Sequence, residues 1–355
     1  MLGQRLKIAR TAAGLSLRDL SDKTGNQVSA QMIGRYEHDE GLPGSTVLIA
    51  LADALGVSEN YLLDPSDLRL ESIEFRKKRL TSRKEEASVE AAVLDAVERY
   101  LTIEDIVGAS SAVWTPPAGV PFRTRSYDEA ESAAGRLRNQ WNLGLDAIPN
   151  FAEFLEEQGI KVIVLPLPGS VSGLMARIRR HDGRIVPVIV VNETHTGERQ
   201  RLTLAHELGH LVLDVAADLD EEQASFRFGG AFLMPAELIW AEVGRNRHAL
   251  AVGELLELKR VFGVSAQAIA YRCKDLGIIG PGVYRTLFQT FARLGWRSPP
   301  YEEPHPFPAE KPHRFRRLCF RAAAEGLASD VKVAELLRVS LRELDREMAA
   351  VSEPC

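Results

Sequence analysis

The chain has 355 residues, of which 45% are hydrophobic and 26% are charged, and its formal net charge is -5. These fractions are typical of a folded globular protein and exclude a chain that is disordered throughout. The net charge argues against a polycation of the histone kind, although it leaves DNA binding by one domain open. The length favours two or three domains.

Cysteine usage and the lack of long apolar runs predict a reduced, cytoplasmic protein. Cys273, Cys319 and Cys355 lie far apart without metal-ligand spacing, so no disulfide framework is expected. The first seven residues lack the apolar core of a signal peptide. No apolar run approaches the roughly 18 residues that cross a bilayer, and we expect no membrane partner.

Residues 1–64 are predicted to form four or five short helices without a strand. Apolar residues recur at helical spacing, as at Leu51 and Leu55. Glycines follow these runs, where helix ends favour a left-handed residue. Serines such as Ser16 and Ser29 precede the runs, where N-cap residues stand.

Residues 65–124 are predicted to form a charged linker and then a bridging helix. Basic residues cluster at 76–79, and a helical pattern follows through Val93, Val97 and Leu101. The stretch 114–119 contains two prolines and a glycine, which predicts a domain boundary there.

Residues 125–290 change to a mixed α/β pattern. The sequence His181-Asp182-Gly183-Arg184 has turn chemistry, which predicts a hairpin in a small antiparallel sheet. The expected elements are helices at 127–141 and 150–158, strands at 161–165, 173–178 and 186–191, and helices at about 198–214, 220–232 and onward to 277. Residues 291–355 are predicted to contain a proline-rich connector and a small helical module.

The strongest chemical signal is His206-Glu207-Leu208-Gly209-His210, an H-E-x-x-H motif. Histidines four residues apart project from one helix face, so both imidazoles can bind one Zn²⁺ at about 2.0–2.1 Å. Glu207 is placed to act as general base toward a water that zinc makes acidic. Two histidines on a helix that merely packs are the alternative, and the apolar neighbours Leu204 and Leu208 favour the motif.

Zinc needs a third protein ligand, and the acidic start of the next helix supplies several carboxylates. Charge alone does not distinguish Asp218, Glu221 and Glu222. Acidic residues at a helix N-terminus are also explained by the helix dipole.

The segments 203–211 and 228–235 resemble the ImmA/IrrE-type metallopeptidases, and the resemblance covers about residues 125–290. In that family a glutamate six residues before the phenylalanine of the second motif completes the zinc site. The resemblance therefore implies His206, His210 and Glu222 as zinc ligands and Glu207 as the catalytic residue, within an α+β zincin-like fold. Phe226 stands where the family usually has a polar residue.

The apolar stretch 187–192 matches the strand that precedes the zinc helix in this family. In zincin-type peptidases such an edge strand can pair with an extended substrate backbone. An ordinary buried strand explains the same residues equally well, and the sequence favours neither interpretation.

Residues 14–21 and 28–37 have helix-turn-helix form, with two helices joined by a short turn that contains glycine. The stretch 1–64 resembles the Xre/Cro-repressor family. By that resemblance Ser29, Ala30, Gln31 and Arg35 face double-stranded DNA, with Gln31 suited to adenine and Arg35 to guanine or phosphate.

The charge of this N-terminal segment weakens the expected attraction to phosphate. Residues 1–66 contain six Lys and Arg and eight Asp and Glu, so attraction to DNA requires that the charges segregate by face. A domain used only for dimerisation or partner contact is the alternative.

These features predict a multidomain, mainly α protein. The expected parts are an all-α helix-turn-helix domain (1–64), a linker and bridging helix (65–124), an α+β peptidase domain with a small antiparallel sheet (125–290), and a connector with a helical module (291–355). The module resembles the tail of Xre-plus-peptidase regulators, which implies partner binding.

The expected function is that of a cytoplasmic transcriptional regulator whose zinc peptidase cuts a repressor or antitoxin in a stress, prophage or toxin–antitoxin response. The expected partners are a DNA operator and a protein substrate or toxin, and Xre-type domains often act as homodimers on two-fold sites. A non-enzymatic DNA-binding antitoxin or repressor, whose zinc domain is structural or senses a partner, is the alternative.

Overall fold

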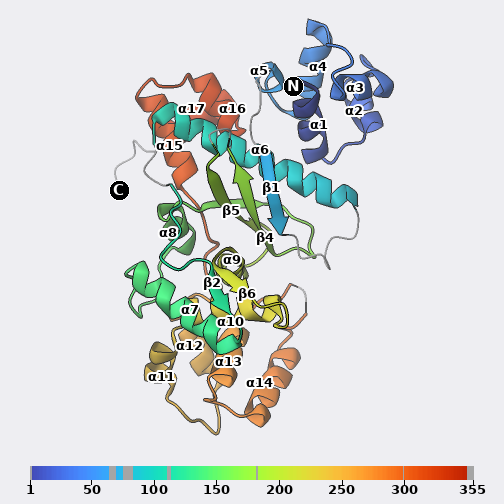
Figure 1. The fold of residues 1–355 in the computed structure, drawn as a ribbon. Helices are drawn as coiled ribbons and strands as arrows, with labels where there is room; N and C mark the ends of the chain where they lie inside the picture. Colours follow the sequence, from blue (N-terminus) through green and yellow to red (C-terminus); the bar gives the residue numbers. More distant parts are fainter. Residues whose placement is uncertain are drawn as a thin grey trace. The chain divides into compact units, whose positions relative to one another are not determined.

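The computed structural model describes residues 2–63, 69–74, 83–109, 113–180, 183–298 and 300–349, and the structural statements that follow concern these residues (Figure 1). Cys355 and the first two residues of the predicted turn, His181 and Asp182, lie outside them, as does most of the predicted linker before residue 83. The chain divides into two compact units. Unit 1 contains residues 1–113, 176–188 and 313–355, and unit 2 contains residues 114–175 and 189–312.

Short helices without a strand fill residues 2–63, as predicted. They are α1 (Leu2–Ala12), α2 (Leu17–Lys23), α3 (Ala30–Glu37), α4 (Ser45–Leu55) and α5 (Glu59–Leu63). Ser16 begins α2 with a capping box, because its hydroxyl accepts the Asp19 N–H and the Asp19 carboxylate accepts the Ser16 N–H. Leu6, Leu20 and Ile33 are completely buried in a core that these helices share.

The bridging helix is α6 (Arg83–Val107), and unit 1 also contains β1 (Arg69–Glu74). Near its middle, α6 holds α1 through an ion pair between Glu98 and the buried Arg5. Further along, Ile103 packs with Leu318 and Val333 of the C-terminal module. That module contains α15 (Arg314–Ala324), α16 (Asp330–Leu337) and α17 (Leu341–Ala349), which confirms its helical prediction.

The β1 strand was not expected, because its sequence lies among charged residues. It joins the four-stranded sheet, whose strand order is β1-β4-β5-β3, with β3 at Lys161–Leu165, β4 at Gly173–Arg179 and β5 at Ile185–Asn192. Hydrogen bonds from Arg180 N to Arg184 O, and from Asn192 N to Ser172 O, define β4 and β5 as the predicted antiparallel hairpin.

Of the two interpretations that the sequence leaves open for the stretch 187–192, the structure supports the buried strand and not the edge strand. The strand β5 has a neighbour on each side in the sheet, so its backbone is not open to an added substrate strand. A near-continuous apolar run such as 186–191 is what a strand buried on both faces requires, and Val188 to Val191 are completely buried.

Unit 2 is mainly helical. Its helices are α7 (Tyr127–Gln140), α8 (Phe151–Glu157), α9 (Gly197–Val212), α10 (Glu221–Leu233), α11 (Ala236–Val243), α12 (Val252–Phe262), α13 (Ala266–Asp275) and α14 (Pro281–Arg293). An additional parallel pair, β2 (Phe122–Thr124) and β6 (Leu213–Val215), was not predicted. No described helix is long and apolar enough to span a membrane.

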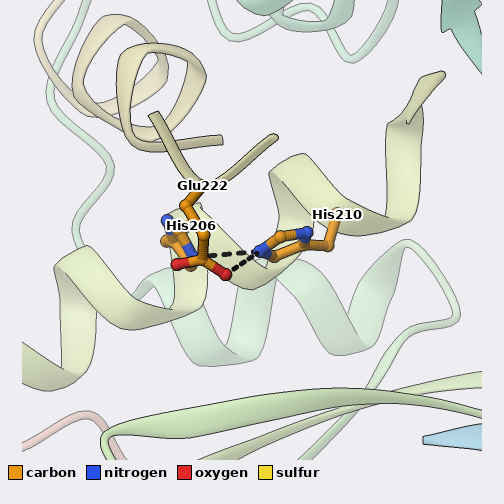
Figure 2. Close-up of side chains that lie close together, drawn as sticks. All are labelled: His206, His210 and Glu222. Carbon is orange, nitrogen blue, oxygen red and sulfur yellow. Dashed lines mark hydrogen bonds and ion pairs between the residues drawn. The ribbon is translucent and has the colours of Figure 1, made fainter. Parts of the chain in front are cut away.

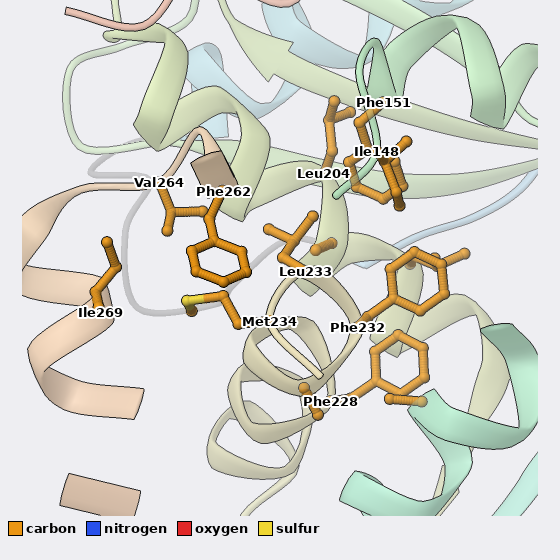
Figure 3. Packing of buried hydrophobic residues seen from close by; sticks show 14 of the residues in the cluster. Ile148, Phe151, Leu204, Phe228, Phe232, Leu233, Met234, Phe262, Val264 and Ile269 are labelled. Carbon is orange, nitrogen blue, oxygen red and sulfur yellow. The ribbon is translucent and has the colours of Figure 1, made fainter. Parts of the chain in front are cut away.

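The core of unit 2 holds α9 and α10 together. Leu204 of α9 and Phe228 and Phe232 of α10 are completely buried in one apolar cluster (Figure 3). The Phe228 and Phe232 rings stack at 5.7 Å between centroids. This packing fixes the two helices that carry the predicted metal ligands.

Candidate metal centre

The helix α9 carries both histidines of the motif into a buried environment. His206 and Glu207 are 1% and 3% exposed, and the apolar side chains of Leu204 and Leu208 are completely buried beside them. Because residues four apart share one helix face, the imidazoles of His206 and His210 lie together, with ring centroids 4.7 Å apart.

Two glycines let α10 approach α9 closely enough to bring a carboxylate to the histidines. A Cβ on Gly209 would lie 3.1 Å from the Cα of Ser225, and a Cβ on Gly229 would lie 3.1 Å from the backbone N of His206. The Asp220 side chain accepts the Gln223 N–H and so caps the start of α10. This start places Glu221 and Glu222 in the first turn, beside α9.

The structure brings together the three predicted ligands, His206, His210 and Glu222 (Figure 2). The two Nε2 atoms are 3.0 Å apart, and the Glu222 oxygens lie 3.7 Å from His206 Nε2 and 3.6 Å from His210 Nε2. Ligands of one tetrahedral zinc at about 2.0–2.2 Å lie about 3.3–3.6 Å from each other. The two nitrogen–oxygen separations lie at the upper end of this range, and the nitrogen–nitrogen separation lies about 0.3 Å below it. The donors are thus close to the spacing of zinc ligands, and their chemistry fits zinc.

The site is buried on one side and open on the other. The His206 side chain is 1% exposed, whereas the Glu222 side chain is 43% exposed. Catalytic zinc sites keep one position free of protein ligands, while structural sites are closed by four. The three donors found together here, with solvent on the Glu222 side, match the open arrangement.

Acidic neighbours favour the protonated form of His210 when no metal is bound. Burial by itself lowers the pKa of His210, but hydrogen bonding to Glu222, the charge of Glu207 and hydrogen bonding to Glu221 outweigh burial and raise the pKa to about 9. Glu221 Oε1 lies 3.2 Å from His210 Nδ1. Glu221 thus lies on the Nδ1 side of the His210 ring, where the Ser225 hydroxyl is also found at 3.5 Å, while Glu222 faces the Nε2 atoms.

The carboxylate predicted to act as general base lies in a tight space next to the sheet. Gly173 begins β4, and a Cβ there would lie 2.4 Å from Thr203 Cγ2 and 3.7 Å from Glu207 Cγ. The bare glycine therefore leaves room for α9 to lie against the strand. Motif spacing predicted Glu207, whereas nothing in the sequence indicated the contribution of Gly173.

Phe226 lies against the predicted metal ligands rather than away from them. Its ring centroid is 4.2 Å from that of His206, and the side chain is 41% exposed. A ring at this position offers no polar group to the site. Phe226 replaces the polar residue that is usual in the family, and its ring thus forms an apolar wall of the site.

The predicted DNA-contacting residues occupy the start and the exposed side of α3. Ser29 caps this helix, its hydroxyl accepting the Met32 N–H at 3.3 Å. Ala30 is half-buried, while Gln31 and Arg35 are exposed one turn apart. Arg35 Nε lies 3.8 Å from the exposed Glu40 carboxylate. DNA contact by these residues stays a prediction.

Two segments of the chain match known domain families. Residues 6–62 match a helix-turn-helix domain, and residues 155–274 match the IrrE N-terminal-like domain. The chain therefore carries an Xre-type helix-turn-helix domain followed by an IrrE/ImmA-like metallopeptidase-family domain, which confirms both resemblances. The mainly helical fold class is confirmed as well.

Two curated proteins are similar to parts of the chain. The radiation response metalloprotease IrrE of Deinococcus deserti is 36% identical over 113 residues, 26% of this chain and 38% of that protein. The SPbeta prophage-derived uncharacterized HTH-type transcriptional regulator YonR of Bacillus subtilis is 38% identical over 63 residues, 18% of this chain and 56% of that protein. The chain thus spans 38% and 56% of the lengths of these relatives.

Proposed function

We propose that this chain is a transcriptional regulator whose zinc-dependent peptidase domain cleaves a repressor or antitoxin protein. The observation that carries the proposal is the cluster of His206, His210 and Glu222 donors with the Glu207 carboxylate beside it. A structural zinc site has no need of that carboxylate. The stress and prophage settings are supported by the names of the relatives, a radiation response metalloprotease and a prophage-derived regulator.

The residues have distinct roles in the proposed hydrolysis. His206, His210 and Glu222 would hold zinc, which would supply a Lewis acid for acidifying water and polarising the peptide carbonyl. Glu207 accepts a proton from the attacking water and later donates it to the nitrogen of the leaving amine. Glu221 lies at the Nδ1 side of His210 and helps to keep its Nε2 directed toward Glu222.

The helix-turn-helix domain supplies the proposed operator contacts. Gln31 and Arg35 lie exposed on α3, the second helix of the motif, which enters the major groove in such domains. Arg5 and Arg10 are held in ion pairs with Glu98 and Glu37. Fewer cations therefore remain for phosphate, and base contacts have to supply a larger share of the affinity.

Cells that produce the wild type or the Glu207→Gln variant test the peptidase proposal. Glutamine preserves the shape of Glu207 but cannot accept the proton, while the zinc ligands stay intact. We expect mass spectrometry of protein N-termini to find new termini, in a regulatory or antitoxin protein, in cells with the wild type alone. The same set of N-termini in cells with the wild type and in cells with the variant, at equal zinc content of the two proteins, would contradict the peptidase proposal. That result would instead support a structural or partner-sensing zinc domain.

A further inference from the structure

A cavity of about 590 Å³ opens next to the predicted zinc ligands within unit 2. Three lining residues place it there. Phe226 contacts the His206 ring, Gln223 follows the ligand Glu222, and Leu202 lies one turn before His206 on α9. The cavity therefore lies within reach of a residue that flanks a bond cleaved at the metal.

The walls of the cavity are aromatic and apolar. Tyr127, Phe226 and Tyr271 line it, together with Met234. Phe226 and Tyr271 are 41% and 47% exposed. Exposed aromatic groups around a concavity mark ligand-binding sites on protein surfaces.

The charged residues that line the cavity already have partners of their own. Arg227 lies 2.7 Å from Glu131 and 3.3 Å from Asp275, and Arg272 is bound by Glu131 as well. The Lys274 ammonium lies over the rings of Tyr271 and Tyr284, 5.0 and 5.1 Å from their centroids. A charged guest would have to compete with these partners, whereas an apolar guest would not.

A bare glycine keeps the cavity open. Gly230 lines it, and a Cβ built there meets nothing within 4 Å, whereas the adjacent Gly229 packs against α9. Any larger residue at position 230 would project its side chain into the cavity from α10.

We propose that this cavity is the pocket that receives a large apolar side chain, such as Leu, Met or Phe, of the substrate residue flanking the scissile bond. This inference rests on the proposed peptidase function and assigns its substrate class. Phe226, Tyr271 and Gly230 are the residues that determine the specificity.

Binding of hydroxamates to the zinc-loaded full chain tests the pocket without a known substrate. Acetohydroxamate reports the metal site alone, and hydroxamates carrying an isobutyl or a carboxymethyl side chain report the pocket. We expect the isobutyl compound to bind at least about tenfold more tightly than the other two in calorimetry, as apolar pockets discriminate by side-chain size. Chelation of the zinc should abolish all binding.

The Gly230→Leu variant should remove the advantage of the isobutyl compound over acetohydroxamate. Gly253→Leu is the matched control, because Gly253 is exposed on α12 and its Cβ also meets nothing within 4 Å; it should keep the full advantage. Tyr271→Ala should reduce the advantage of the isobutyl compound, because it removes one wall of the cavity. This variant provides the test if Gly230→Leu does not fold.

Equal affinity of the wild type for the isobutyl compound and acetohydroxamate would overturn the pocket while leaving the zinc site intact. A preference for the carboxymethyl compound would overturn the apolar assignment. The absence of any hydroxamate binding to the zinc-loaded protein would overturn the peptidase proposal, and the pocket with it.

Discussion

Gly229 and Gly230 are neighbours in the chain with opposite surroundings. A Cβ on Gly229 would lie 3.1 Å from backbone atoms of Ala205 and His206, while one on Gly230 would stand in open space. Sequence alone did not distinguish them, because both are simply glycines within a helix, where glycine costs about 0.5–1 kcal/mol relative to alanine. Gly229 is required by the close packing of α10 against α9. Gly230 instead lines the open cavity.

Alanine at these two positions should therefore have opposite effects. We expect Gly229→Ala to destabilise the protein by about 1–3 kcal/mol, because the added methyl separates α10 from α9, and to weaken zinc binding through displacement of Glu222. Gly230→Ala should stabilise by about 0.5–1 kcal/mol. Urea unfolding of the apo proteins and zinc titration measure both effects; equal stability of the two variants would contradict the close approach of the helices.

Spacing predicted the histidines of the site but could not choose its carboxylate. Glu221 and Glu222 have the same charge, and both lie in the first turn of α10, where the helix dipole favours any acid. The choice depends on how α10 crosses α9, which is a tertiary property. In the structure Glu222 faces the Nε2 atoms and Glu221 faces Nδ1 of His210.

The predicted proline-rich connector is built into unit 2 as a structural element. Its Glu310 is 5% exposed, binds Arg201 of α9 at 2.6 Å, and accepts the N–H groups of Phe151 and Ala152 at the start of α8. Glu303 accepts the Ala266 N–H at the start of α13. Proline content predicted the absence of regular structure, but the burial of these carboxylates depends on partners far away in sequence.

Loss of the Glu310 carboxylate should be costly. Glu310→Ala leaves the buried Arg201 guanidinium without its charged partner, and removal of one partner from a buried pair costs about 3–5 kcal/mol. Asp214→Ala is the control, because Asp214 forms an exposed pair with Arg123 at 2.6 Å, worth about 0–1 kcal/mol. Thermal unfolding compares the two, and a Glu310 variant as stable as the Asp214 variant would contradict the structural role of the segment.

Glu198, at the start of α9, should make stability depend on pH. Burial alone raises the pKa of Glu198, but hydrogen bonds from Lys259 and from the Phe307 N–H outweigh burial and lower the pKa below its ordinary value. A lowered carboxylate pKa stabilises the folded state above the unfolded pKa, and this stability is lost as pH falls through the folded value. Wild-type stability should therefore decline below about pH 4.5.

The Glu198→Gln variant should be less stable than the wild type at pH 7 and should show a smaller further decline in acid. Glu257→Gln is the control, because Glu257 is exposed and forms an exposed ion pair with Arg260, three residues away. This variant should keep the wild-type pH profile. Unfolding midpoints between pH 7 and pH 3.5 measure this. A Glu198→Gln profile parallel to the wild type would contradict the assignment.

At the scale of the whole molecule, local sequence signals predicted the helices. They did not predict strands that pair with segments far away in the sequence. The helices of residues 2–63, α6 and the C-terminal module follow from apolar periodicity and caps. The strand β1 and the β2–β6 pair are defined by partners about 90 or more residues away, and short segments carry little trace of such pairing. The proposed DNA-binding helix lies in unit 1 and the metal centre in unit 2.

The operator contacts should depend on the exposed side of α3. We expect the Gln31→Ala, Arg35→Ala double variant to lose sequence preference, since each base contact contributes about 1–3 kcal/mol of discrimination. Selection from a random duplex DNA library should enrich a motif with the wild type and none with the double variant. Lys7→Ala is the control, because Lys7 is exposed on α1 and lies outside α3. This variant should enrich the same motif as the wild type. Enrichment of that motif by the double variant would contradict the assigned helix face.

Zinc stoichiometry of the full chain tests the central claim most directly. After reconstitution, elemental analysis should find about one zinc per chain in the wild type and much less in Glu222→Ala. Glu221→Ala is the matched control, because it removes a partner of His210 Nδ1 and none of the three proposed ligands. It should still bind zinc, with an affinity lower by about 10–100-fold. A wild type without zinc, or a Glu222→Ala variant with its full complement, would contradict the proposed metal centre.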